Sequence, residues 1–181
     1  MTNTLRDYTD NIKAVERPTW DEYFLELAHV ISKRSLDANT KHGCVFVDEK
    51  NRIVSTGYNS FPPGFPDKQL PNWRKQDIEP DCPKYDFMVH AEANAISNLI
   101  TKNYQSLTCY LTGIPCVPCL RLMIGNNVKR IVISTTKCGW QFTNSEKPAF
   151  DELVHCSGIK LETLNMIYCQ TTVSEYNWVY K

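Results

Sequence analysis

The stretch VKRIVIS, residues 128–134, constrains the fold most, because it is a nearly continuous apolar run. A strand of this kind is typical of a sheet that is buried on both faces. Helical patterns lie on either side of it, in PCVPCLRLMIGNN (115–127) and in EKPAFDELVHCSG (146–158). Strands that alternate with helices predict an α/β sandwich, with helices on both faces of a central sheet.

The remaining elements follow from hydrophobic periodicity. Four more strands are predicted at 44–47, 52–57, 107–112 and 159–165. Two more helices are predicted, one at 19–35 with Thr19 as its N-cap and one from about His90 to Thr101. Residues 59–86 hold six prolines and no clear periodicity, and a loop of this length is usually functional or disordered. Its aromatic residues favour an ordered, functional loop.

We therefore predict a three-layer α/β/α sandwich around a central mixed five-stranded sheet. No repeat, low-complexity tract or linker interrupts the chain, so residues 1–181 are expected to form a single domain. Residues 1–17 would be a polar leader and residues 166–181 a tail at its edges.

Composition bears on partners and on location. Twenty basic residues balance twenty acidic ones, which argues against a broad electrostatic surface for nucleic acid or for an anionic membrane. No apolar run is long enough to span a bilayer, and the N-terminal stretch lacks the apolar segment of a signal peptide. We expect a cytoplasmic protein whose cysteines stay reduced, with neither nucleic acid nor membrane as a partner.

A possible metal site stands out among the polar residues. Only Cys116 and Cys119, of eight cysteines, form a C-x-x-C pair, and His90 and Glu92 lie about 25 residues earlier, where a helix should start. Catalytic zinc takes three protein ligands and leaves its fourth position to water. His90, Cys116 and Cys119 would supply the ligands, and Glu92 would move protons without binding the metal.

Blander explanations exist for each motif taken alone. A lone H-x-E usually consists of exposed polar residues without a specific role, and a lone C-x-x-C could be a structural zinc site or a redox pair. The two motifs occur in order, separated by a predicted helix and strand, which favours a catalytic site. A structural zinc site would want a fourth ligand, for which Glu92 is a rare choice. His-x-Glu with Pro-Cys-x-x-Cys is the signature of zinc deaminases of nucleobases.

Over roughly residues 18–165 the sequence resembles the cytidine-deaminase superfamily and, within it, the deoxycytidylate deaminases. The resemblance is carried by HAEANAI, PCVPC and VKRIVIS, and by GYN at 57–59 and LPNWR at 70–74. It implies a cytidine-deaminase-like fold and the zinc-dependent hydrolysis of dCMP to dUMP and ammonia, which supplies dUMP for thymidylate synthesis.

The same resemblance assigns roles to individual residues. His90, Cys116 and Cys119 would hold one Zn²⁺ per chain, and Glu92 would be catalytic. Substrate contacts would fall on Asn59, which hydrogen-bonds the deoxyribose, on Ala91 and Pro115, and on Lys137 and Asn39 near the phosphate. Effector contacts would fall on Ser60, Pro63, Gly64 and Arg74.

Regulation and assembly are also implied. Members of the family are commonly hexamers that dCTP activates and dTTP inhibits, so we expect a homo-hexamer with these effectors, and Mg²⁺ accompanying dCTP. Ser60 stands where glycine is usual, and glycine permits backbone conformations that serine avoids. Trp73 and Arg74 would serve equally well as a subunit contact.

Other functions stay open at this point. A deaminase of a tRNA base should carry a basic surface, and a deaminase of free nucleosides needs no phosphate contact and no long central loop. A non-catalytic, zinc-stabilised binding module would have lost Glu92. A second, structural zinc near the loop would have only Cys82, Cys44, His42 and His29 to use, in no recognised spacing, so buried thiols and ordinary polar histidines are the better account.

Overall fold

The computed structural model describes residues 17–37, 40–65, 87–135 and 146–165. Five strands form one sheet in the order β2-β1-β3-β4-β5. Strand β1 is antiparallel to β2 and β3, whereas β3, β4 and β5 are parallel. The predicted mixed five-stranded sheet is therefore confirmed, with strand bounds at Gly43–Asp48 (β1), Ile53–Tyr58 (β2), Leu107–Leu111 (β3), Val128–Ser134 (β4) and Lys160–Leu164 (β5).

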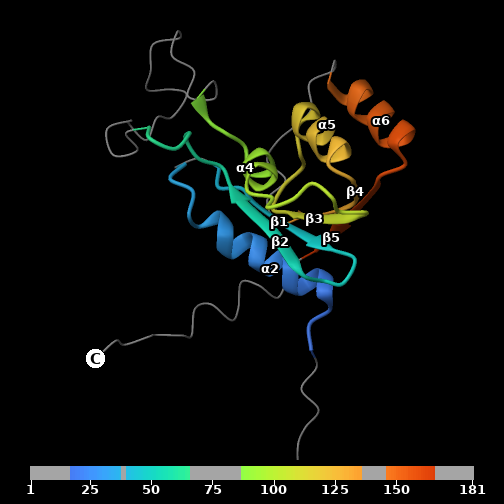
Figure 1. Ribbon diagram of the computed structural model, residues 1–181, viewed down its shortest axis with the longest axis horizontal. Coiled ribbons are helices and arrows are strands. Elements are labelled where there is room, and N and C mark those ends of the chain that lie inside the picture. Colours follow the sequence, from blue (N-terminus) through green and yellow to red (C-terminus); the bar gives the residue numbers. More distant parts are fainter. Residues whose placement is uncertain (1–16, 38–39, 66–86, 136–145, 166–181) are drawn as a thin grey trace, which may run out of the picture.

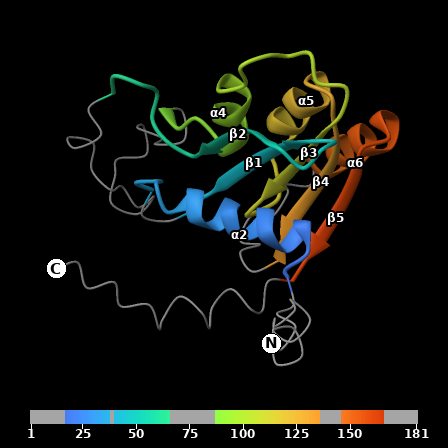
Figure 2. The same cartoon turned by 60° about the horizontal axis from the view of Figure 1, so that its bottom comes forward.

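Helices cover both faces of this sheet, as Figure 1 shows. Helix α2, Trp20–Ser32, lies on one face, and α4, Ala91–Ser97, α5, Val117–Gly125, and α6, Glu146–Ser157, lie on the other. Figure 2 shows α2 running beneath the strands. The predicted three-layer α/β/α sandwich is confirmed.

Each face of the sheet has its own hydrophobic core. Successive strand residues point to opposite faces, so Val45 joins the core under α2 while its neighbour Phe46 joins the core under α4 and α5. Gly43 lets α2 approach β1 closely, because a Cβ at this position would overlap the carbonyl oxygen of Ala28. A larger residue there would push the helix off the sheet.

Two helix boundaries test the sequence predictions. Thr19 caps α2 as expected: its hydroxyl accepts from the Glu22 N–H at 3.2 Å, and the Glu22 carboxylate accepts from the Thr19 N–H at 2.7 Å. The helix predicted from His90 to Thr101 is shorter. It ends at Ser97, where Asn98 is the C-cap and donates from its main-chain N–H to the carbonyls of Asn94 and Ile96. The Asn98 side chain donates to the carbonyl of Thr56 on β2 at 3.0 Å.

No helix in the ranges given above is long and apolar enough to cross a membrane.

A polar network fastens the start of α2 to the sheet. The guanidinium of Arg130, on β4, donates two hydrogen bonds of 2.7 Å to the Asp21 carboxylate, which also accepts one of 2.7 Å from the Tyr110 hydroxyl. The Arg130 hydrogen bonds hold the pKa of Asp21 below its ordinary value, and burial raises the pKa of Tyr110. Two parallel hydrogen bonds make this pair stronger and more directional than an ordinary surface ion pair.

We expect Arg130→Gln to lower the free energy of unfolding by about 1–3 kcal/mol, because Asp21 and Tyr110 lose a charged donor. Lys147→Gln is the control, since Lys147 and Asp151 form an exposed pair within α6, and should cost less than about 0.5 kcal/mol. Because the pKa of Asp21 is lowered, its contribution is present above the ordinary pKa of aspartate and is lost as the pH falls through the lowered value. Urea unfolding at neutral and acidic pH would measure the loss of stability in each variant and its dependence on pH. Equal losses of unfolding free energy in the two variants would contradict the prediction.

Candidate active site

The starts of α4 and α5 bring the predicted metal ligands together. His90 is the N-cap residue of α4, and Cys116 is the N-cap residue of α5; neither side chain makes a capping hydrogen bond. Cys119 lies in the first turn of α5 and is 4% exposed. Strand β3 leads directly into α5, so the sheet sets where both sulfur atoms lie.

The three ligand atoms are placed as a metal site requires. The Nδ1 atom of His90 is 3.4 Å from the sulfur of Cys116 and 3.5 Å from the sulfur of Cys119. All three atoms lie within 4.8 Å of one another. Tetrahedral zinc with ordinary bond lengths separates such atoms by about 3.6–3.8 Å. The donor set and its spacing therefore fit zinc with three protein ligands.

The electrostatics of the two thiols also favour a cation. Hydrogen bonding from Cys119 lowers the pKa of Cys116 to about 4, and the same contact raises the pKa of Cys119. The hydrogen bond with Cys116 raises the pKa of His90. Without a cation, one of the two adjacent sulfurs is a thiolate and the other a thiol, and they share one proton. A bound divalent cation would displace that proton and make both sulfurs thiolates.

Glu92 lies beside this group and outside the ligand set. Its side chain belongs to the first turn of α4, and the residue is 7% exposed. Burial raises the pKa of its carboxyl group, and hydrogen bonding to Cys119 opposes that shift. A buried carboxylate next to the ligands and outside the ligand set is suited to taking up and releasing protons.

A second pair of thiols forms part of the core near Glu92. The sulfurs of Cys44 and Cys109 are 3.5 Å apart, and neither residue is exposed. Burial raises the pKa of both, so they remain neutral thiols. Among the described residues only His90, Cys116 and Cys119 form a possible metal group, so neither Cys44 nor the histidines at 29 and 42 contribute to a second one; Cys82 lies outside the described residues.

Asn59 follows the end of β2, and two hydrogen bonds fix its side chain there. Its side-chain oxygen accepts from the His42 N–H at 2.7 Å, and its amide nitrogen donates to the carbonyl of Thr40 at 2.9 Å. It is 5% exposed. Main-chain hydrogen bonds of 2.8 and 3.1 Å join Ser60 to Val89, the residues that follow Asn59 and precede His90. Asn59 and His90 are therefore each one residue away from the same bridge.

The other predicted substrate residues have different outcomes. Ala91 and Pro115 are both buried, next to the ligands His90 and Cys116. Asn39, Lys137 and Arg74 lie outside the described residues, so their roles stay predictions.

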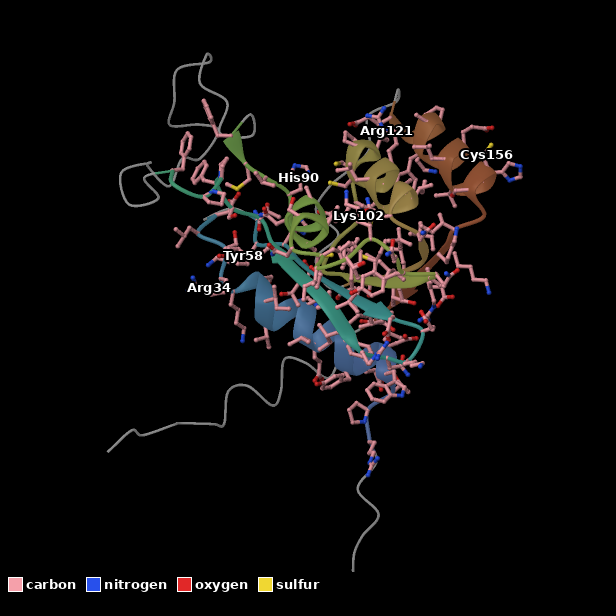
Figure 3. All side chains as sticks on the ribbon, in the orientation of Figure 1. Arg34, Tyr58, His90, Lys102, Arg121 and Cys156 are labelled. Atoms are coloured by element: carbon pink, nitrogen blue, oxygen red, sulfur yellow. The ribbon has the colours of Figure 1, made fainter. Side chains whose placement is uncertain are left out.

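A cleft of about 410 Å³ lies beside the start of α4, and none of the metal ligands lines it. Its wall includes three of the four residues predicted to contact an effector, Ser60, Pro63 and Gly64. The Arg34 guanidinium lies 5.9 Å from the centre of the Tyr58 ring, and Figure 3 shows these two side chains next to each other and apart from His90. Sequence reasoning missed several lining residues, namely Arg34, Asp37, Tyr58, Met88, Asn94 and Asn98. The four-residue spacing of the two asparagines on the helix after His90 was the available signal.

Comparisons with known proteins agree with this arrangement. The family model described as the cytidine and deoxycytidylate deaminase zinc-binding region matches residues 18–135. A probable deoxycytidylate deaminase from Caenorhabditis elegans is 41% identical over 124 residues, which are 68% of this chain and 61% of that protein. Deoxycytidylate deaminase from Homo sapiens is 35% identical over 118 residues, which are 65% of this chain and 66% of that protein. The match thus spans less than two thirds of the length of either relative.

A solved structure shows that the fold is shared. The dCMP deaminase from the cyanophage S-TIM5, crystallised with dCMP and dUMP, superimposes with a TM-score of 0.62 at 20% identity. The match covers 83% of this chain and all of that one. At this identity it supports the α/β cytidine-deaminase-like architecture, whereas the residue-level assignments rest on the geometry described above.

Proposed function

Since this chain belongs to the cytidine and deoxycytidylate deaminase zinc-binding family, we propose that it catalyses the hydrolytic deamination of dCMP to dUMP and ammonia. The observation that carries the proposal is the buried Glu92 carboxylate beside the converging atoms of His90, Cys116 and Cys119. A binding module held together by zinc would have no use for such a carboxylate. The product would serve as a precursor for thymidylate synthesis.

The proposed chemistry balances with a single water molecule. A zinc ion held by His90, Cys116 and Cys119 would lower the pKa of a water molecule so that it could attack at neutral pH. Glu92 accepts a proton from that water and delivers it to the ring nitrogen N3, while the new carbon–oxygen bond forms at C4. The bond from C4 to the amine then breaks, and a second proton that passes through Glu92 leaves with ammonia. The raised pKa of Glu92 suits a group that must both accept and return protons.

Substrate binding would use the end of β2, where Asn59 lies next to the start of α4. Asn59 would hydrogen-bond the deoxyribose, with Ala91 and Pro115 beside the base. Support comes from the bonds to His42 and Thr40, which fix the Asn59 side chain one residue from the bridge to Val89. Lys137 and Asn39 would contact the phosphate.

The cleft beside α4 would bind the effectors dCTP, with Mg²⁺, and dTTP. Arg34 places a positive charge at its wall for the phosphates, and Phe61 and Phe65, stacked with centroids 5.6 Å apart, offer an aromatic surface to a base. Ser60, Pro63 and Gly64 line the same cleft. Arg74 would complete it.

We further propose that residues 1–181 form a single domain, that the protein assembles as a homo-hexamer and that it works in the cytoplasm. The two hydrophobic cores share one sheet, which supports a single folding unit.

The test is deamination of dCMP by the purified protein, followed as the loss of cytosine absorbance. We expect turnover of dCMP and little of CMP or deoxycytidine, an increase with dCTP and Mg²⁺, and inhibition by dTTP. Sedimentation in the same buffers would report the oligomer. Turnover of deoxycytidine equal to that of dCMP would indicate a nucleoside enzyme. Zinc binding with no turnover of any of these compounds would refute the dCMP assignment and direct the search to other bases and RNA.

A further inference from the structure

The side chains of α4 occupy the open edge of the sheet. Strand β2 is the first in the sheet order, so β1 is its only neighbouring strand in the described chain. Asn94, on α4, donates from its amide to the carbonyl of Tyr58 at 2.8 Å. Gly57 lets the helix come this close, because a Cβ there would overlap the carbonyl oxygen of Ala91. The first turn of α4 therefore rests directly on the end of β2.

The same amide group of Asn94 makes a second contact, with Ser60. Its nitrogen lies 3.1 Å from the Ser60 hydroxyl oxygen, and that hydroxyl in turn donates to the carbonyl of Phe61 at 3.1 Å. An amide nitrogen carries two hydrogens, so Tyr58 and Ser60 together use both of them. A glycine at position 60 could not accept this hydrogen bond from Asn94, because it has no hydroxyl group.

These contacts form part of the wall of the cleft and are close along the chain to the proposed reaction centre. Asn94 is two residues beyond Glu92 on α4, and Ser60 is joined by two main-chain hydrogen bonds to Val89, the residue before His90. Tyr58, Ser60 and Asn94 all line the cleft as well. Asn59 lines it too, so a molecule in the cleft could reach both Asn59 and the residues that connect it to His90 and Glu92.

We propose that Ser60 and Asn94 are positioning residues that couple occupancy of the cleft to the geometry of the metal ligands and Glu92. This inference rests on the proposed function, in which a nucleoside triphosphate occupies the cleft. The coupling acts through direct contacts. The triphosphate contacts Tyr58, Ser60 or Asn94, and the hydrogen bonds among these residues adjust. The first turn of α4 then shifts against β2. Neither residue takes part in the chemistry.

The test compares Ser60→Ala, which removes only the hydroxyl, and Asn94→Ala with wild type, with Ser60→Thr as the variant that restores a hydroxyl. Asn126→Ala is the matched control, because Asn126 donates its amide to a main-chain carbonyl at the far end of α5, away from the cleft. For each protein, zinc content, binding of dCTP with Mg²⁺ by calorimetry, and kcat and KM for dCMP with and without dCTP would be measured.

In wild type and in Asn126→Ala we expect dCTP to change kcat/KM by at least about fivefold. In Ser60→Ala and Asn94→Ala, zinc should stay bound and dCTP should still bind, but its effect should be weaker by about two- to thirtyfold. Ser60→Thr should recover the response. A response in Ser60→Ala and Asn94→Ala equal to that of wild type would overturn the proposal.

A readout without turnover separates this inference from the proposed function. Replacing zinc by cobalt(II) makes the ligand geometry visible in the absorption spectrum. If dCTP shifts that spectrum in wild type and not in Ser60→Ala, the coupling holds even where dCMP proves not to be the substrate. If dCTP leaves the wild-type spectrum unchanged at saturation, the coupling is refuted, whatever the turnover of dCMP.

Discussion

Glu92→Gln is expected to lower kcat for dCMP by at least about 10²–10⁴-fold, the usual contribution of a general acid–base group. Glutamine keeps the shape of the side chain and removes the group that carries the proton. Zinc content should not change, because Glu92 is outside the ligand set. The melting temperature should stay level or rise, since burial disfavours the charged carboxylate, as its raised pKa indicates.

Glu49→Gln provides the control for this experiment. Glu49 is exposed and lies between β1 and β2, so the same chemical change there should alter kcat by less than about twofold. Single-turnover measurements at saturating dCMP would separate the chemical step from product release. Normal turnover in Glu92→Gln, with zinc bound, would refute the proton-transfer role of Glu92.

Cys116→Ala should release zinc and destabilise the fold. Removing one of three protein ligands should weaken zinc binding by more than the roughly 10–100-fold that loss of an outer hydrogen-bond partner of a ligand costs. Each tenfold loss of affinity removes about 1.4 kcal/mol of the stability that saturating zinc adds. A hundredfold loss should therefore lower the melting temperature by about 5–10 °C for a chain of this size.

Two other cysteines separate loss of metal from loss of packing. Cys156 is exposed on α6, and Figure 3 shows it well apart from His90, so Cys156→Ala should keep both zinc and stability. Cys109 is buried, so Cys109→Ala should lower stability through packing and still retain zinc. A chelator should lower the melting temperature of wild type and of both controls by more than that of Cys116→Ala. Full metal content in Cys116→Ala would mean that the ligands are assigned wrongly.

The elements of the fold could be predicted because their signals are local. The five strands and four helices follow from hydrophobic periodicity within each segment, and the observed bounds differ from the predicted ones by at most four residues, with none at β4. The largest difference is at the end of α4, where the side chain of the C-cap residue Asn98 bonds to Thr56 on another element. Periodicity within the helix contains no information about such a partner.

The metal group could be predicted for a similar reason. The spacing of Cys116 and Cys119 places both in reach of one ion at the start of one helix, and His90 with Glu92 repeats the arrangement at another. The substrate and effector residues that complete the site follow from the family resemblance and not from local spacing. Asn39, Lys137 and Arg74 lie outside the described residues and stay predictions.

The sequence by itself thus determined the layered fold, through periodicity within each segment, and the members of the metal group, through two recognisable motifs whose residues His90 and Cys116 are 26 apart. Only the tertiary structure decided what surrounds that group. Asn94 meets Ser60 across 34 residues, and Arg130 meets Asp21 across 109. Each of these side chains, taken alone in the sequence, is an ordinary polar residue. Its role comes from the partner that packing of the helices against the sheet brings within hydrogen-bonding distance.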